Sequence, residues 1–292
     1  GSTTMAETHE TPGVDLDAYL RRIGYEGPRE PTLAVLRDLA RLHTLAIPFE
    51  NLDPLLGRPP KLDAASVEAK LVRSRRGGYC FEHNPLLQRV LRALGFEARS
   101  LAARVLLRQP EGVTAPRTHA LLRVEAEGRS HLVDVGFGGQ TPSGPLLLVP
   151  GPEQATPHEP CRIDAVGPDE AREFVLQARI AGAWTPLYRF HLFEHVAIDH
   201  EVANHYVATH PASFFRNAIV AARLSPQGRH LLFNDRLAFQ HVDGRREERI
   251  LPDAPALFDA LETVFGIAAP DRPALAAALG RLTERPGRDG SD

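Results

Sequence analysis

The pattern of the sequence changes near Gly95, and this change limits the folds open to the chain. Before it, apolar residues recur every three or four positions, as they do on one face of a helix. This spacing predicts a helix from about residue 14 that stops at Gly24, a second from about Pro31 or Thr32 that ends at Pro48, and two more at residues 63–78 and 80–95. After it come short β-like runs separated by glycine and proline, at residues 98–109, 118–139, 145–149 and 173–192.

The last third of the chain mixes both patterns. Helical spacing at residues 212–224 is followed by strand-like runs at 230–242 and 246–251, and a helix is predicted within 254–267. Helices thus come first, strands second and a mixture last. Such segregation predicts an α+β fold and argues against the regular alternation of a Rossmann-like sheet.

Composition narrows the class of protein. The 292 residues carry a net charge of −3, which gives no sign of a nucleic-acid or anionic membrane partner. No apolar run approaches the ~20 residues that span a bilayer. Two cysteines do not make a disulfide framework, so we expect a cytoplasmic protein. Met5 is the only methionine, and we expect it to be the native start, with residues 1–4 a cloning remnant.

Cys80 stands where a thiol ionises easily. In RRGGYCFEHN, residues 75–84, it follows Gly77 and Gly78 at the predicted start of a helix. Unpaired backbone N–H groups and the helix dipole favour the nucleophilic thiolate there. We expect the two glycines to let the loop turn tightly and to leave Cys80 open. The alternative is a buried, unreactive cysteine, so a catalytic interpretation needs a base and an orienting carboxylate.

His119 and Asp134 can supply both partners if the segment between them forms a hairpin. A two-residue turn at Glu127–Gly128 would make them diagonal neighbours on one face of the sheet. The apolar neighbours of Asp134 predict burial, and we expect Nδ1–H of His119 to donate to its carboxylate. With Cys80 the three would form an activated thiol. The alternative is a hairpin with one surface histidine and one turn-stabilising aspartate.

Five motifs carry a family resemblance. In chain order they are HTLAIPFENLDPLLGRPP, RGGYCFEHN, THALLRV, LVDVGFGGQTPSGPLLL and EVANHYVATHPASFF. The match runs from about Tyr19 to beyond Phe215. In this order the motifs resemble those of bacterial arylamine N-acetyltransferases.

The resemblance implies a three-part fold with a cysteine-protease-like catalytic core. A helical bundle at residues 1–97 would carry the nucleophile, and a central β-barrel at 98–203 would carry the histidine and the aspartate. An α/β lid at 204–292 would end in a disordered tail.

The resemblance also implies an activity, that of an acyltransferase of xenobiotic metabolism. Acetyl-CoA would be the co-substrate, with no metal, and small arylamines, arylhydrazines or N-hydroxyarylamines would accept the acetyl group. Transfer would be ping-pong through an acetyl-cysteine, with coenzyme A leaving first. Matched residue by residue, the catalytic triad is Cys80, His119 and Asp134.

Further positions carry over from the same resemblance. Phe49, Phe137 and Phe215 would line the acceptor pocket, with simple core packing as the alternative for each. Thr209 and Ser213 fall in the segment that resembles a CoA-contacting region.

The resemblance also implies one ion pair, and the sequence departs from the family's pattern at two positions. Glu50 and Arg76 match a structural ion pair, with a weak surface pair as the alternative. Pro85 has no N–H to bond the Phe81 carbonyl, so we expect the helix either to kink there or to start later than Cys80. His205 stands where the family often has an aromatic residue.

Residues 191–195, HLFEH, have the H-x-x-E-H form of some zinc proteases. The surrounding composition is strand-like, and a strand would hold His191 and His195 too far apart for one zinc ion. We therefore expect no metal site here, and we assign no role to Cys161.

Other functions remain open at this stage. A papain-like thiol hydrolase or a transglutaminase-like enzyme could use the same triad. A macrolactam-forming amide synthase of the same family would use another acyl donor. A non-enzymatic redox sensor would need only a reactive Cys80.

Overall fold

The structure is a computed structural model that describes residues 13–284. The expectations for a remnant at residues 1–4, a start at Met5 and disorder at 285–292 lie outside the described residues. Within residues 13–284, no helix is long and apolar enough to cross a membrane.

The N-terminal unit is helical, as its apolar spacing predicts. Its helices are α1 (Leu16–Ile23), α2 (Leu33–Ala46), α3 (Leu52–Leu55), α4 (Ala64–Glu68), the π-helical turn η1 (Ala69–Arg73) and α5 (Cys80–Ala93). Local chemistry sets their ends: Gly24 closes α1 with a positive φ of 71°, and the Thr32 hydroxyl accepts a hydrogen bond from the Val35 N–H to start α2. The sequence missed the single turn of α3.

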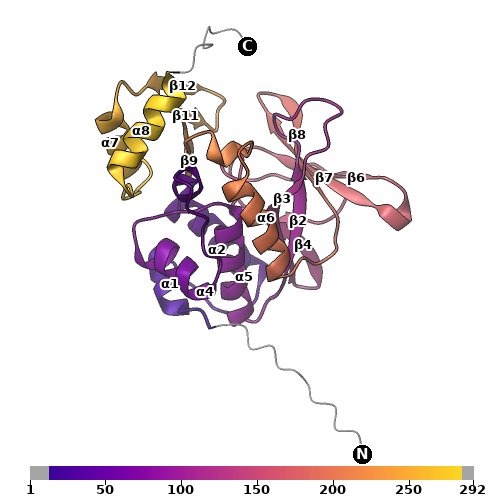
Figure 1. The fold of residues 1–292 in the computed structure, drawn as a ribbon. Helices are drawn as coiled ribbons and strands as arrows, with labels where there is room; N and C mark the ends of the chain where they lie inside the picture. Colours follow the sequence, from indigo (N-terminus) through magenta and orange to yellow (C-terminus); the bar gives the residue numbers. More distant parts are fainter. Residues whose placement is uncertain (1–12, 285–292) are drawn as a thin grey trace, which may run out of the picture.

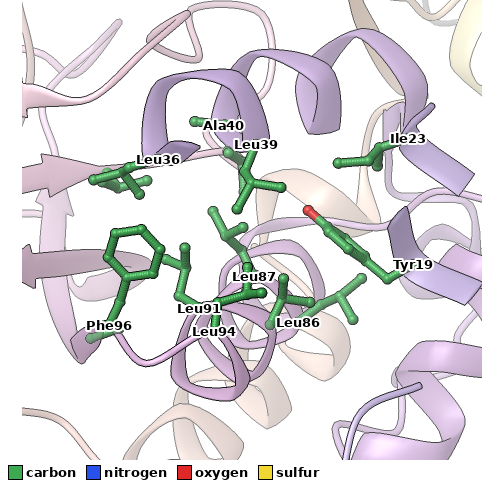
Figure 2. Close-up of a cluster of buried hydrophobic side chains, with 14 of the residues drawn as sticks. Tyr19, Ile23, Leu36, Leu39, Ala40, Leu86, Leu87, Leu91, Leu94 and Phe96 are labelled. Carbon is green, nitrogen blue, oxygen red and sulfur yellow. The ribbon is translucent and has the colours of Figure 1, made fainter. Parts of the chain in front are cut away.

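The core of this unit lies between α1, α2 and α5 (Figure 2). Fully buried side chains meet there: Tyr19, Leu36, Leu39, Leu87 and Leu91. Each such apolar side chain contributes about 1.5–3 kcal/mol relative to exposure. The cluster extends onto the strands beside α5, so the same packing fixes the helix that begins with Cys80.

Pro85 lies inside α5 and does not end it. The helix begins at Cys80 and runs through Pro85 to Ala93. The expectation of a later start is therefore wrong. Glu82 supports the first turn, because its Oε1 accepts a hydrogen bond from the Tyr79 N–H at 3.2 Å.

The central sheet has seven antiparallel strands in the order β5-β4-β3-β2-β8-β7-β6. Their bounds are β2 Glu97–Val105, β3 Arg117–Ala126, β4 Arg129–Val133, β5 Leu146–Leu147, β6 Cys161–Val166, β7 Glu173–Ile180 and β8 Ala183–Phe190. Gln154 nearly closes this sheet into a barrel. Its side chain exchanges hydrogen bonds with the backbone of Leu147 on β5, and its backbone exchanges two with Cys161 on β6. The predicted α+β fold with a central barrel is confirmed.

A second sheet joins one strand of the N-terminal unit to four strands from the last third of the chain. Its order is β1-β9-β10-β11-β12, with β1 (Phe49–Glu50) contributed by the N-terminal unit. The others are β9 Val220–Ser225, β10 Gly228–Phe233, β11 Arg236–His241 and β12 Arg246–Ile250. Helices α7 (Ala254–Thr263) and α8 (Arg272–Thr283) accompany it, shown in gold and yellow in Figure 1.

Helix α6 (Ala197–Thr209) lies between the bundle and the barrel in Figure 1. Here the sequence prediction fails. The helix predicted at 212–224 is wrong, because that segment holds a 3-10 turn (Phe214–Arg216, η3) and strand β9, while α6, α8 and β6 were missed. The division at 97 and 203 stays a prediction, and its second boundary falls inside α6.

Candidate active site

Cys80 begins α5 and lines a cavity. The residue is only 4% exposed, and its Sγ lies 3.8 Å from the Thr118 carbonyl oxygen on β3. The first turn of a helix leaves backbone N–H groups without intrahelical partners. The nucleophile predicted from the sequence thus lies at a helix N-terminus, beside the hairpin.

The glycines around Cys80 are required by close approach rather than by flexibility. A Cβ on Gly77 would lie 1.9 Å from the Pro48 carbonyl oxygen, and one on Gly78 would lie 2.5 Å from Oε1 of Glu82. Neither glycine has a positive φ. The expectation that they serve a tight turn is therefore corrected: they let the loop before Cys80 pack against its neighbours.

The hairpin between β3 and β4 has the expected register. Glu127 and Gly128, with φ of 51° and 76°, form its two-residue turn. Ladder pairs run from Ala126–Arg129 to Leu122–Val133. His119 and Asp134 lie just beyond the last pair, and His119 Nε2 is 2.7 Å from Asp134 Oδ2.

The nitrogen in this contact differs from the prediction. Nε2 of His119, and not Nδ1, meets the carboxylate. Nδ1 is then the nitrogen that remains to exchange a proton with Cys80, whose thiol is close enough to contribute to the raised pKa of His119.

Asp134 is held by four donors. Tyr188 Oη and His119 Nε2 share its Oδ2, at 3.0 and 2.7 Å. Asn84 Nδ2 and the Gly136 N–H share its Oδ1, at 3.0 and 2.9 Å. This buried carboxylate is fully hydrogen-bonded, as an ionised group in the interior must be.

Electrostatics favour an ion pair between the last two members of the triad. Burial alone would lower the pKa of His119, but the Asp134 carboxylate outweighs it and raises the pKa well above 6.5. Burial alone would raise the pKa of Asp134, but His119 outweighs it and lowers the pKa. The His119 imidazolium therefore lies beside the Cys80 thiol, where it can exchange a proton with an incoming or leaving group.

Asn84 and Tyr188 were missed by sequence reasoning. Asn84 lies one turn after Cys80 on α5, and it donates to the Ala120 carbonyl as well as to Asp134. Its spacing of four from Cys80 was a usable signal. Tyr188 comes from β8, 54 residues after Asp134, and no local pattern points to it.

A cavity of about 560 Å³ opens beside Cys80 and His119. Phe49, Phe137 and Phe215 all line it, so the structure brings together the three aromatic residues predicted for the pocket. No aspartate or glutamate is among the described residues that line the cavity. Most of the lining is apolar, and Arg108, Arg236 and Arg246 give the cavity its positive charge. The aromatic part of the lining suits an aromatic guest.

The Glu50–Arg76 pair is buried rather than superficial. Arg76 Nε lies 2.7 Å from Glu50 Oε1, and the Glu50 side chain is fully covered. Asp53 forms ion pairs with both Arg76 and Lys70, and Lys70 Nζ also lies 2.7 Å from Glu82 Oε2 on α5. The weak surface pair considered from the sequence is excluded.

The two residues predicted to contact CoA, Ser213 and Thr209, differ in their position relative to the cavity. Ser213 is buried and lines the cavity, and its hydroxyl donates to the Val207 carbonyl oxygen at 2.5 Å. Thr209 does not line the cavity, and its hydroxyl donates to the His205 carbonyl of the same helix. His205 itself is exposed on α6.

The HLFEH segment is a loop after β8 and not a strand. His191 and His195 stack with ring centroids 5.5 Å apart, so the argument that a strand separates them is wrong. Among residues 13–284, no group of three or more His, Cys, Asp or Glu side chains is arranged to hold a metal ion. Cys161 is a buried free thiol at the start of β6.

A buried Cys–His–Asp constellation at an apolar cavity is typical of enzymes that form covalent intermediates through cysteine. Comparison with known proteins narrows this class. Residues 32–272 match the N-acetyltransferase family.

Three relatives carry the comparison further. The chain is 45% identical to the arylamine N-acetyltransferase of Mycobacterium tuberculosis, over 94% of this chain and 99% of that protein. It is 40% identical to the arylamine N-acetyltransferase / N-hydroxyarylamine O-acetyltransferase of Salmonella typhimurium, over 88% and 90%. The structure of the Mycobacterium marinum enzyme in complex with CoA superposes with a TM-score of 0.87 at 43% identity, covering 92% of this chain and 99% of that one. The chain belongs to the arylamine N-acetyltransferase family, and it is an acyltransferase.

Proposed function

We propose that the protein transfers an acetyl group from acetyl-CoA to arylamines, arylhydrazines or N-hydroxyarylamines through an acetyl-Cys80 intermediate. The observation that carries the proposal is that Cys80 and His119 lie together at one wall of a largely apolar cavity, with Asp134 bonded to His119 behind that wall. The named activities of the relatives support the acceptor class, and the CoA complex of the M. marinum enzyme supports the donor.

The first half-reaction forms the thioester. The Cys80 thiolate attacks the carbonyl carbon of acetyl-CoA, and the tetrahedral intermediate places negative charge on the former carbonyl oxygen. The Cys80 N–H, in the first turn of α5, is the donor we assign to this oxyanion. When the C–S bond to CoA breaks, the His119 imidazolium protonates the departing CoA thiolate.

The second half-reaction consumes the thioester. The neutral amine attacks acetyl-Cys80, and His119, now neutral, takes the proton that the amine loses. Cleavage of the thioester returns the Cys80 thiolate and releases the amide. Asp134 stays ionised throughout, because it accepts four hydrogen bonds, and it keeps Nε2 of His119 as the donor.

The cavity supports an aromatic acceptor. Phe137 lies edge-on to His119 with centroids 4.9 Å apart, and Phe49 and Phe215 lie 5.9 Å apart on the same cavity. We propose these three as acceptor contacts and Ser213 as a CoA contact. Thr209 is set apart from Ser213 because it does not line the cavity.

Intact-protein mass spectrometry tests the proposal. The protein is mixed with acetyl-CoA and no amine, beside Cys80→Ala as the matched control that keeps the second thiol, Cys161. We expect one acetyl group on the wild type, none on the variant, and loss of the group when an aniline is added. An unmodified wild type whose Cys80 still reacts with iodoacetamide would overturn acetyl-CoA as the donor.

A further inference from the structure

The segment after Asp134, residues 136–141, is called here the pocket loop. Its first five residues, Gly136 to Gln140, line the cavity beside Cys80 and His119. Three of its six residues are glycine, so the free loop has unusually many accessible conformations. Within the loop, Thr141 bonds back to the Gly138 carbonyl through its N–H and its hydroxyl, at 3.1 and 2.8 Å. A loop of this composition needs an external anchor to keep one shape.

Arg229 on β10 supplies that anchor. The residue is only 3% exposed, and its Nη1 donates to the carbonyl oxygens of Gly139 and Thr141 at 3.1 and 2.7 Å. Its Nε and Nη2 donate to Oε2 of Glu159, at 3.1 and 2.8 Å. One guanidinium thus joins the strand, the pocket loop and the segment before β6.

Charge and shape make this contact hard to replace. Burial alone would raise the pKa of the Glu159 carboxyl, but Arg229 outweighs it and lowers the pKa, so the pair is ionised. A planar guanidinium can reach a carboxylate and two carbonyls at once, which the single ammonium of lysine cannot. Leu231, two residues further along β10, packs against the same loop. A Cβ added at Gly139 would lie 3.1 Å from the Leu231 side chain.

The anchored loop reaches the reacting groups through Phe137. The Phe137 ring lies 4.9 Å from the ring of His119 and 5.0 Å from that of Tyr188. At the next residue, a Cβ on Gly138 would lie 3.5 Å from the ring of Phe49. A shift of the pocket loop therefore changes the width of the cavity between Phe137 and Phe49.

We propose that Arg229, held by Glu159, is a positioning residue that fixes the pocket loop and so sets the fit of the acceptor amine. The inference rests on the proposed function, because it concerns the acceptor side of that cavity. Arg229 does not line the cavity and acts only through the loop.

Hydrogen–deuterium exchange tests the anchor without any activity. In Arg229→Lys, the peptide that covers residues 136–141 should exchange faster, while the β7–β8 hairpin exchanges as in the wild type. Glu159→Gln should show a weaker change in the same peptide. Arg179→Lys is the matched control, because Arg179 and Glu153 form an exposed ion pair 3.0 Å long that touches no part of the loop. Unchanged loop exchange in Arg229→Lys overturns the proposal.

Half-reaction kinetics test the consequence. In Arg229→Lys the KM for a substituted aniline should rise about ten-fold, because a displaced wall costs orientation, whereas alkylation of Cys80 by iodoacetamide should change less than about two-fold. If Arg229 had only a general structural role, kcat/KM, the rate of Cys80 alkylation and the stability would all fall together, and that result would overturn the proposal.

A double variant separates this mechanism from a general loss of packing. If Arg229 acts through Phe137, Arg229→Lys should add little to the KM change of Phe137→Leu. Fully additive effects overturn the proposal. If the proposed function itself fails, the wild type shows no acetyl adduct while the exchange result still stands, so the two failures are distinguishable.

Discussion

Tyr188 and His119 donate to the same oxygen of Asp134. Oδ2 accepts the Tyr188 hydroxyl at 3.0 Å and His119 Nε2 at 2.7 Å, and the two rings lie 4.9 Å apart. The tyrosine comes from β8 and the histidine from β3, so two strands of the barrel fix this carboxylate from different directions.

Because Tyr188 is one of four donors to Asp134, we expect its loss to lower activity less than loss of the carboxylate itself. Tyr188→Phe removes one of four hydrogen bonds to Asp134 and should lower kcat/KM about ten-fold. Asp134→Asn removes the charge that holds the His119 proton and should cost about 10³–10⁴-fold. Steady-state kinetics with one aniline and acetyl-CoA measure both. Equal losses in the two variants would contradict the idea that Tyr188 only supports the carboxylate.

Asn84 joins α5 to the β3–β4 hairpin region, and replacing it with an acid should introduce a charge conflict. Asn84→Asp is nearly isosteric but replaces the Nδ2 donor with an oxygen 3.0 Å from Asp134 Oδ1. Two buried carboxylates at this distance cannot both ionise, so one pKa must rise. We expect the variant to be less stable at pH 7 by about 3 kcal/mol or more.

The sign of the pH dependence checks that explanation. The unfolded state of Asn84→Asp is ionised at pH 7, whereas its native state holds an extra proton, so acid favours the native state. The stability gap to the wild type should therefore narrow between pH 7 and pH 5 in urea unfolding. A gap that stays constant would point to lost packing instead.

Gly136 allows α5 to approach the pocket loop closely. A Cβ there would lie 2.9 Å from the Cys80 Cα and 3.0 Å from the His83 Cβ. Gly136→Ala should cost about 1–3 kcal/mol of stability and slow Cys80 alkylation, because the nucleophile helix must move. Gly144→Ala is the control, since its Cβ meets nothing within 4 Å. Equal melting temperatures for the two variants would refute this assignment.

The sequence predicted that Cys80, His119 and Asp134 would lie together, because the form of each local element depends on residues close in the chain. Cys80 follows two glycines at a helix start, and the register of the His119–Asp134 hairpin follows from a two-residue turn. Both features depend on residues close in the chain. The Tyr188–Asp134 and Arg229–Glu159 contacts join residues that are far apart in the chain. They form only when the sheets assemble, so no local sequence pattern predicts them.

The errors in the predicted secondary structure also arise from long-range contacts and from burial that the local pattern does not show. Residues 212–224 have helical spacing, yet Val220–Ser225 pairs with β1 and β10, and those long-range ladders override the local preference. Helix α6 was missed because its apolar residues face both ways: Val207 and Ala208 are buried, while Ile198 and Val202 are exposed. Without a one-sided stripe, periodicity gives no helical signal.

A buried chain of hydrogen bonds links α1, α2 and α5 to the backbone just before β1. His83 Nε2 must donate to the Pro48 carbonyl oxygen at 3.0 Å, so its Nδ1 accepts from His43 Nε2 at 2.8 Å. His43 Nδ1 then accepts the Tyr19 hydroxyl, also at 2.8 Å. Every position is filled when both histidines are neutral, and an added proton would bring two donors face to face.

This chain predicts acid lability. Burial lowers the pKa of His43 well below 6.5 and that of His83 to about 4, while the unfolded chain titrates near 6.5. Between pH 6.5 and 4 the unfolded state therefore binds more protons, so stability falls on acidification, by about 1.4 kcal/mol per pH unit for each histidine. Urea unfolding from pH 7 to pH 5 should show this slope, and His83→Gln should reduce it. The exposed control His205→Gln should leave it unchanged, and a wild-type stability that is flat across this range would refute the argument.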